Sequence, residues 1–257
     1  MSAERPGPTT ALCDYDDTHV RYRGRDLVGE LLTGDRNFID VAMEHILGRS
    51  VSPGERRVMN AVMIAIMEHG LTPSAIATRS VYMSAPENLQ GAVAAGLLAV
   101  GSQFVGTIEN AARLLQSLVA LPDEAARREA ARAIIADHKA RGVRIPGFGH
   151  HLHRPDDPRA VRLLEIGREA GVAGEHVAAL ALLAEEVDGA AGRHVTVNAT
   201  GATGALMGDM GLPVELMRGF AVISRCAGLV AHIAEERERP SGRHIWEVVD
   251  KAIPYAP

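Results

Sequence analysis

Apolar residues recur at helical spacing along most of the chain, and helix-start signals divide them into segments. Residues 52–55, Ser-Pro-Gly-Glu, have the form of a capping box, in which the serine hydroxyl accepts from the backbone N–H of Glu55 and proline takes the first helical position. The apolar run that follows predicts a buried helix ending at Gly70. Thr72-Pro73 and residues 84–87, Ser-Ala-Pro-Glu, repeat the start signal and predict further helices.

The same pattern continues through the second half of the chain. Segments rich in Ala, Leu, Arg and Glu predict five more helices, and residues 1–10 are expected to form a loose tail. No change in composition marks a linear boundary between domains. The expected helices cover about 121–142, 157–171, 174–188, 194–208 and 213–238.

The composition supports this helical interpretation. Aromatic residues make up only 4% of the chain, although 47% of all residues are apolar. Strands favour aromatic and β-branched side chains, whereas Ala, Leu, Arg and Glu are good helix formers. We therefore expect an all-α protein.

The charge and the cysteines exclude several classes of protein. A net charge of −5 gives no basic surface for nucleic acid or for an anionic membrane. Cys13 and Cys226 are too few for a disulfide framework. The N-terminal residues do not resemble a secretory signal, and no uninterrupted apolar run has the length of a membrane span. We expect a cytoplasmic protein.

One loop differs in composition from the rest of the chain. Residues 145–159 are rich in Gly, Pro, His and Arg, and three histidines lie at positions 150, 151 and 153. A metal site is not expected there, because no Cys or acidic residue stands at ligand spacing. Glycines 147 and 149 instead allow the backbone to approach a ligand, so that its amides and His150 can contact a polar or anionic group.

Two further residues have open interpretations. His69 follows a buried apolar helix, where a histidine is more often structural than catalytic. Arg225 lies in an apolar stretch, and a buried guanidinium needs an anionic partner. That partner is either a structural carboxylate or a bound polycarboxylate. The residues alone therefore indicate a helical protein with a His- and Arg-lined site for an anion.

Several motifs, in order along the chain, resemble the citrate synthase family and more closely its citryl-CoA lyase branch. EHGLTPSAIATR (68–79) resembles the family's DHG motif, and GFGHHLHRPDDPRA (147–160) resembles its GFGH…DPR motif, the most specific of the set. VRYRGRDLVGELL (20–32), FAVISRCAGLVAHIAEE (220–236) and GRHIWEVVD (242–250) resemble three further family segments.

The resemblance implies a fold and an assembly. The family is all-α, with a large and a small domain that close over the substrates, normally in a homodimer. By analogy, residues 107–205 would form the inserted small domain, and residues 1–106 plus 206–257 would form the large domain. Such an insertion explains why no linear boundary is visible.

The resemblance also implies roles for individual residues. His69 and His150 match histidines that contact the oxaloacetate or citryl group, and Arg159, Arg225 and Arg243 match arginines that hold its carboxylates. The region against which coenzyme A lies corresponds to Gly147, Gly149 and Arg154. The expected partners are a CoA thioester and a di- or tricarboxylate. Neither a metal nor a permanently bound cofactor is needed, since coenzyme A is part of the substrate or product.

Two positions depart from the synthase pattern. Phe104 stands where synthases have a histidine that helps to enolise acetyl-CoA, and the lyase branch also has phenylalanine there. Thr200 stands where the family has its catalytic aspartate. A threonine hydroxyl does not ionise near neutral pH, so it contributes at most a hydrogen bond to a thioester enolate.

The implied activity is cleavage of citryl-CoA, or of a related 3-hydroxy-3-carboxyacyl-CoA, to acetyl-CoA and oxaloacetate. We expect His150 to act on the tertiary hydroxyl proton, His69 to orient the substrate and the arginines to hold its carboxylates. Two alternatives stay open. One is a synthase-type enzyme working in the condensation direction, and the other is a non-catalytic homologue that binds CoA thioesters or polycarboxylates.

Overall fold

The computed structural model describes residues 7–101, 107–150 and 152–256. These residues form two compact units, which divide the chain after Arg56. Helices dominate, as the composition predicted, and the all-α class is confirmed.

The first unit contains the small sheet that the sequence patterns did not predict. Three short antiparallel strands pair in the order β1-β2-β3, with Cys13 opposite Tyr22. The unit then continues into helix, and Asn37 and Asp40 form a capping box at the start of α1. Its elements are β1 (Cys13–Tyr15), β2 (Val20–Tyr22), β3 (Arg25–Asp26), the one-turn π-helix η1 (Leu27–Leu31) and α1 (Phe38–Leu47).

The remaining helices follow one another without further strands in the described residues. Helix α2 (Pro53–Met67) begins in the first unit, and all later helices belong to the second. They are α3 (Pro73–Ser84), α4 (Leu89–Leu98), α5 (Thr107–Val119), α6 (Glu124–Ala140), α7 (Pro158–Glu169), α8 (Glu175–Ala191), α9 (Ala199–Asp209), α10 (Val214–Glu238) and α11 (Gly242–Ala252).

Some helix boundaries differ from the predictions. Helix α2 ends at Met67 rather than Gly70, and α4 is capped by Asn88 rather than by a residue of 84–87. Helix α9 begins at Ala199 because the Asn198 side chain accepts from the N–H groups of the first turn. The patterns also missed α1, α5 and α11. None of these three helices has a proline at its first position, which is the start signal on which several predictions relied.

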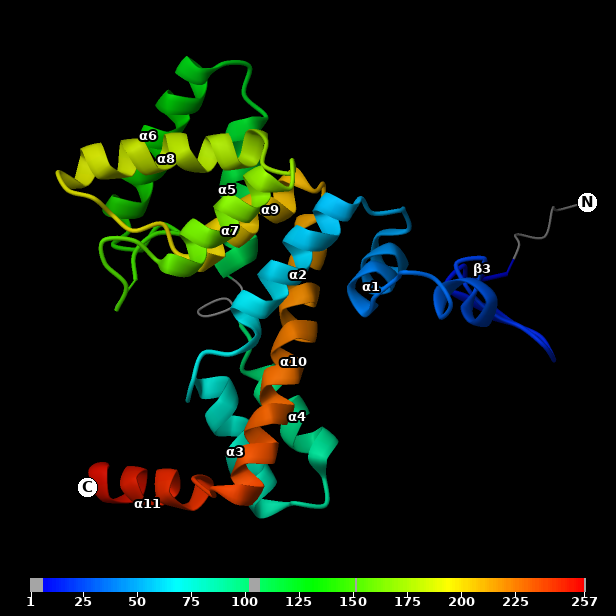
Figure 1. The fold of residues 1–257 in the computed structure, drawn as a ribbon. Coiled ribbons are helices and arrows are strands. Elements are labelled where there is room, and N and C mark those ends of the chain that lie inside the picture. Colours follow the sequence, from blue (N-terminus) through cyan, green and yellow to red (C-terminus); the bar gives the residue numbers. More distant parts are fainter. Residues whose placement is uncertain (1–6, 102–106, 151, 257) are drawn as a thin grey trace, which may run out of the picture. The chain divides into compact units, whose positions relative to one another are not determined.

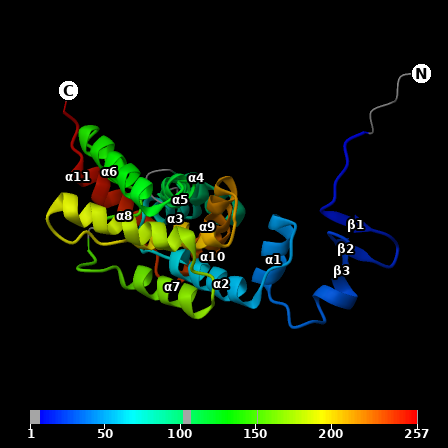
Figure 2. The same ribbon diagram turned by 90° about the horizontal axis from the view of Figure 1, so that it is seen from above.

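The second unit packs around two hydrophobic clusters. One is built by α5, α6, α8 and α9 and includes Leu115, Leu118 and Leu183. The other joins α4 to α10 through Val93 and Leu229. Helix α10 contacts α3 and α4 as well as α5 and α9, so it runs along both groups of helices (Figure 1). Figure 2 shows the same unit from above.

Helices α5 to α9 pack largely on one another. The proposed boundaries of the large domain (1–106 plus 206–257) and the inserted small domain (107–205) remain a prediction, because the division into compact units falls at Arg56 instead.

Helix α10 is long and apolar enough, with a mean hydropathy of 1.3, to cross a membrane by length and composition alone. Half of that apolar window is buried inside the second unit. The helix also carries Arg225, His232 and Glu236 in buried positions. These features are those of a core helix, which passes the same length and composition test.

We predict that Gly228→Ala destabilises the protein. A Cβ at this position of α10 would lie 2.2 Å from the backbone oxygen of Met67, so the two helices must separate. Overpacking of this kind raises the free energy of the folded state by about 1–3 kcal/mol. At this chain length, Tm falls by roughly 2–4 °C for each kcal/mol.

Gly219→Ala, in the same helix, is the matched control. Nothing lies within 4 Å of its Cβ position, and alanine is the better helix former by roughly 1 kcal/mol. Thermal melting of both variants checks the prediction, and an equal Tm for Gly228→Ala and the wild type would contradict it.

Candidate functional site

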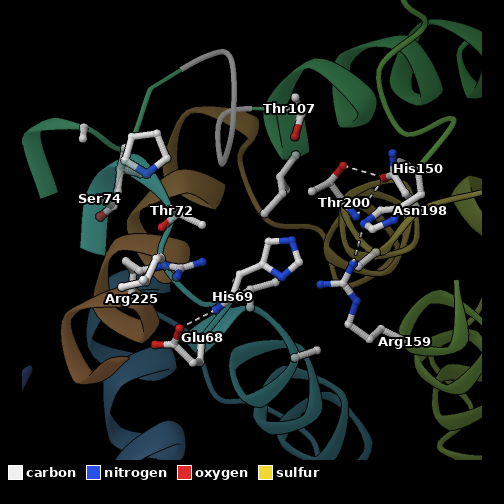
Figure 3. A pocket seen from close by; sticks show the side chains of 18 residues that line it. Glu68, His69, Thr72, Ser74, Thr107, His150, Arg159, Asn198, Thr200 and Arg225 are labelled. Carbon is white, nitrogen blue, oxygen red and sulfur yellow. Dashed lines mark hydrogen bonds between the residues drawn. The ribbon is translucent and has the colours of Figure 1, made fainter. Parts of the chain in front are cut away.

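A cavity of about 510 Å³ opens within the second unit (Figure 3). Its walls come from α2 and the segment after it, the starts of α3, α5, α7 and α9, the loop before α7, and the middle of α10. Most of its polar groups are histidine, arginine, hydroxyl or amide side chains. The polar lining residues are Glu68, His69, Thr72, Ser74, Thr107, His150, Arg159, Asn198, Thr200 and Arg225.

The structure brings together five residues that the sequence singled out. They come from segments far apart in the chain and all line this cavity: His69, His150, Arg159, Thr200 and Arg225. Figure 3 shows Arg225 and Glu68 on one side and His150, Asn198, Thr200 and Arg159 on the other, with His69 between them.

Other predicted residues lie elsewhere. Arg243 is on α11, where its exposed guanidinium pairs with Glu247 and lies over the Trp246 ring, and it does not line the cavity. Gly147, Gly149 and Arg154 do not line it either. Phe104 lies outside the described residues.

Both ring nitrogens of His150 face N–H donors. Its Nδ1 accepts from the backbone N–H groups of Leu152 (3.1 Å) and His153 (3.0 Å). An Nδ1 that accepts two hydrogen bonds carries no proton, so the neutral ring is protonated at Nε2. That Nε2 lies 3.3 Å from Nη2 of Arg159. If Nε2 carries the proton, it cannot accept from Arg159, and in this tautomer both groups are donors beside the cavity, as a developing oxyanion or a carbonyl oxygen requires.

The expectation that His150 acts on the tertiary hydroxyl proton stays a prediction. In the tautomer with the proton on Nε2, that nitrogen can donate to a substrate oxygen and cannot accept a proton, and protonation of Nδ1 would break both backbone hydrogen bonds.

Asp157 holds the second donor in place. Its carboxylate is fully buried and accepts from Arg159 Nε (3.0 Å), Arg159 Nη2 (2.8 Å) and the backbone N–H groups of Arg159 and Ala199. Burial raises the pKa of Asp157, but hydrogen bonds from Arg159 and Ala199 outweigh it and keep the pKa below the usual value. In the sequence, Asp157 stands only as the first residue of a predicted helix, and no local signal shows that its carboxylate holds Arg159 and Ala199.

Arg225 is the second cationic wall of the cavity. It is 7% exposed, and its Nε and Nη1 atoms have no hydrogen-bond partner among the described residues. Burial lowers the pKa of Arg225, and the charge of Glu68 partly offsets that effect. Glu68 thus lies near Arg225 without bonding to it. A buried guanidinium in this condition favours the bound polycarboxylate over the structural carboxylate as its partner.

Two threonines of the cavity differ in how their hydroxyl groups are bonded. The Thr200 hydroxyl donates to Asn198 Oδ1 at 2.7 Å, so only its lone pairs face a ligand. A hydrogen bond from Thr200 to an enolate would require that contact to break. Thr72 makes no capping hydrogen bond at α3, and its buried Oγ1 has no partner among the described residues. The sequence identified Thr72 only as a cap and gave no signal that separates a capping threonine from an unbonded one.

The comparisons with known proteins agree with this geometry. The sequence profile described as citrate synthase, C-terminal domain, matches residues 30–246. The chain belongs to the citrate synthase family. The resemblance seen in the motifs is thereby confirmed.

Similar solved structures include a citryl-CoA lyase and an ATP citrate lyase. The citryl-CoA lyase from Hydrogenobacter thermophilus is 31% identical, with a TM-score of 0.83 over 97% of this chain and 94% of that one. An ATP citrate lyase from Methanosaeta concilii, solved in complex with (3S)-citryl-CoA, shares the fold at 20% identity and a TM-score of 0.76, over 99% of this chain and 42% of that one.

Curated relatives are longer than this chain. The ATP-citrate synthase beta chain protein 2 of Arabidopsis thaliana is 25% identical over 71% of this chain. The matched region spans 32% of the plant protein, about a third of its length.

In this member of the citrate synthase family, the GFGH loop is fixed against the start of α9. The Gly147 carbonyl accepts from the N–H of Asn198 (3.0 Å), and the Gly149 N–H donates to Thr196 O (2.7 Å). Gly147 has a φ of +88°, and a Cβ there would lie 2.9 Å from Gly201 Cα. The first glycine of the motif therefore serves backbone packing rather than lining the cavity.

Among the described residues, His150, His153 and Asp157 place potential metal-ligand atoms within 4.8 Å of one another. They fit a metal ion poorly. His150 Nδ1 already accepts two hydrogen bonds, and both carboxylate oxygens of Asp157 accept two each. A metal would have to displace these bonds and stand beside the Arg159 guanidinium.

His194 holds the C-terminal part of this loop through Asp156. Its Nδ1 lies 2.8 Å from Asp188 and its Nε2 lies 3.0 Å from Asp156, so both nitrogens face carboxylates. Hydrogen bonds to Asp188 first, and then to Asp156, raise the pKa of His194 above its ordinary value of 6.5. Only the imidazolium form can donate to both carboxylates.

We predict that this tie stabilises the protein more at acidic pH than at alkaline pH. Because the folded-state pKa is the higher one, the contribution of His194 is fully present below pH 6.5 and is lost as the pH rises through the raised pKa. Urea unfolding from pH 6 to pH 9 checks this in the wild type and in His194→Gln. The difference in unfolding free energy between them shrinks as the pH rises, and a constant difference would refute the tie.

Proposed function

We propose that the chain is a carbon–carbon lyase that cleaves citryl-CoA, or a related 3-hydroxy-3-carboxyacyl-CoA, to acetyl-CoA and oxaloacetate. The observation that carries the proposal is the pair of His150 Nε2 and Arg159 Nη2 in one cavity with Arg225, whose Nε and Nη1 have no hydrogen-bond partner among the described residues. This arrangement suits a polycarboxylate with a reacting oxygen. The likeness to the Hydrogenobacter citryl-CoA lyase over nearly the whole of both chains supports the reaction type.

The reaction is a retro-Claisen cleavage. The tertiary hydroxyl loses its proton, its oxygen becomes a ketone, the neighbouring C–C bond breaks, and the electron pair moves into the thioester enolate, which is then protonated at carbon. His150 and Arg159 donate to the oxygen on which negative charge develops. Arg225 holds a substrate carboxylate by a charge-assisted hydrogen bond.

If His150 Nε2 carries the proton, the acceptor of the hydroxyl proton is a group other than His150. Of the bases among the described lining residues, Glu68 already accepts three hydrogen bonds at Oε1. His69 lies between the two cationic walls and is the remaining imidazole. We assign it the hydroxyl proton, which it then returns to the enolate carbon, so that no other proton source is needed.

The same donors would also serve the reaction in the condensation direction. The bonding of Thr200 supports a second candidate function. Because its hydroxyl is engaged by Asn198, the enolate has no acid at the position of the family aspartate. A homologue that binds CoA thioesters or polycarboxylates without turnover would have this feature.

We predict that His150→Ala loses two or more orders of magnitude in kcat for citryl-CoA, because one oxyanion donor contributes roughly 10²–10³ in rate. Thr200→Ala is the matched variant from the same cavity, and its kcat changes less than about threefold, because Thr200 donates no hydrogen bond to the enolate. The assay mixes pure protein with citryl-CoA and follows oxaloacetate by coupled NADH oxidation.

Equal activity of His150→Ala and the wild type would contradict the proposed mechanism. Calorimetric binding of oxaloacetate and coenzyme A without turnover would favour the binding homologue. Acetyl-CoA-dependent thiol release with a 2-oxo acid, in the absence of cleavage, would favour the synthase.

The cellular setting and the assembly belong to the proposal as well. We expect a cytoplasmic homodimer that takes a CoA thioester, with coenzyme A lying against the loop of Gly147, Gly149 and Arg154. The position of Arg243 bears on the dimer. It lies outside its own chain's cavity, so it can hold a substrate carboxylate only if a second copy supplies it.

We predict that two inactive variants restore activity when mixed. If sites are shared, a heterodimer of His150→Ala and Arg243→Ala has one intact site and one site with both defects. Random exchange then recovers about a quarter of the wild-type activity. Unfolding and refolding the mixture, followed by the citryl-CoA assay, tests this. Recovery no greater than the sum of the single variants would show that Arg243 acts within its own chain or not at all.

A further inference from the structure

A stripe of buried polar residues runs along one face of α10, from the cavity toward α11. Arg225, His232 and Glu236 are spaced by seven and four residues, so they share a helix face, and each is less than 9% exposed. Arg225 belongs to the cavity, whereas the proposed reaction does not use His232 or Glu236. What they contact indicates what they do.

His232 connects two charged groups in a fixed direction. Arg79 Nε donates to His232 Nδ1 at 3.0 Å, so Nδ1 carries no proton. The ring proton is therefore on Nε2, which donates to Glu68 Oε1 at 3.1 Å. Arg79 is itself 2% exposed and is held by Glu235 and Glu236.

The far end of this network is anchored at α11. Glu236 accepts Nη1 of Arg79 at 2.7 Å on Oε2 and the N–H groups of Ser241 and Gly242 on Oε1. Burial raises the pKa of Glu236, but hydrogen bonds from Gly242, Arg79 and Ser241 outweigh it and hold the pKa below its usual value. The network is thus a satisfied set of charges whose members cannot move independently.

The near end of the network shapes the cavity. Besides His232, Glu68 Oε1 accepts from the backbone N–H groups of His69 (2.8 Å) and Gly70 (2.6 Å). These bonds turn the carboxylate toward the backbone that carries His69. The attraction between Glu68 and Arg225 is electrostatic only, and no hydrogen bond joins them.

We propose that His232 is a positioning residue that keeps Glu68 on the backbone of His69 and so leaves Arg225 available for a substrate carboxylate. Without the donor at His232 Nε2, the anionic Glu68 would turn to the unpartnered guanidinium of Arg225, which needs an acceptor. The carboxylate that Glu68 then supplies would compete with the ligand. That the ligand is a substrate carboxylate rests on the proposed function.

Two substitutions separate the two hydrogen bonds of His232. Asparagine places a polar atom near the Nδ1 position and none at Nε2, so His232→Asn keeps an acceptor for Arg79 and loses the donor to Glu68. His232→Gln keeps a donor to Glu68, because the glutamine amide reaches the Nε2 position, and loses the acceptor for Arg79. The two variants have similar polarity, and Tm values measured in parallel separate folding defects from binding defects.

Isothermal calorimetry with oxaloacetate as the probe tests the consequence for binding. We expect His232→Asn to raise Kd by about tenfold or more, the loss of roughly one charge-assisted hydrogen bond, and His232→Gln to raise it by less than about threefold. Adding Glu68→Gln to His232→Asn should restore most of the affinity, since it removes the competing charge. Equal weakening by both single substitutions, or no restoration in the double variant, would overturn the proposal.

A crystal structure of His232→Asn without ligand decides the positioning independently of activity. We expect a Glu68 carboxylate oxygen within hydrogen-bond distance of Arg225. A Glu68 that stays on the His69 and Gly70 N–H groups would overturn the proposal whatever the binding data show. Absence of oxaloacetate binding and of citryl-CoA cleavage in the wild type would instead refute the proposed function, and the movement of Glu68 would still decide the role of His232.

Discussion

The fully buried carboxylate of Asp157 is the constraint on which the geometry of the site depends. It caps α7, holds the side chain of Arg159 by two hydrogen bonds and accepts from the backbone of Ala199 at the start of α9. One anion thereby joins the GFGH loop, the helix that follows it and the helix that carries Thr200. A buried carboxylate is tolerated only when its charge is compensated and its lone pairs are occupied, and here both conditions are met by groups that form the cavity.

The side of the cavity formed by Arg225 and Glu68 has the reverse arrangement of charges. There the cation is buried and incompletely bonded, while the nearby anion is occupied by other donors. An unsatisfied buried polar group costs roughly 1–3 kcal/mol, more when it is charged. An anionic ligand would supply the missing acceptor, so this arrangement favours binding of a carboxylate in the proposed function.

Together the two walls suggest how a lyase could work without the family's aspartate. Donors to the reacting oxygen are fixed by local hydrogen bonds at His150 and by Asp157 at Arg159. Thr200 is directed to Asn198 rather than to the ligand. In the proposed mechanism, these donors stabilise charge at the former hydroxyl oxygen, and His69, rather than a residue at position 200, protonates the enolate.

The helical class, most helix starts, the family and five cavity residues can be predicted from the amino-acid sequence alone. Capping and proline signals are local, and motif residues keep their order along the chain, so neither requires knowledge of distant contacts. The same signals do not predict the three-stranded sheet, whose strands are only two or three residues long, or α1, α5 and α11, none of which has a proline at its first position.

What each cavity residue can do depends on contacts that form only in the folded chain. The state of Arg225 depends on Glu68, 157 positions away, and the direction of the His232 ring depends on Arg79, 153 positions away. The same holds for Asp157, whose bond to Ala199 crosses 42 residues. The protonation state of a side chain, and whether it is free to bind a ligand, depend on the donors and acceptors around it. Those neighbours come from distant parts of the chain and cannot be identified from the sequence.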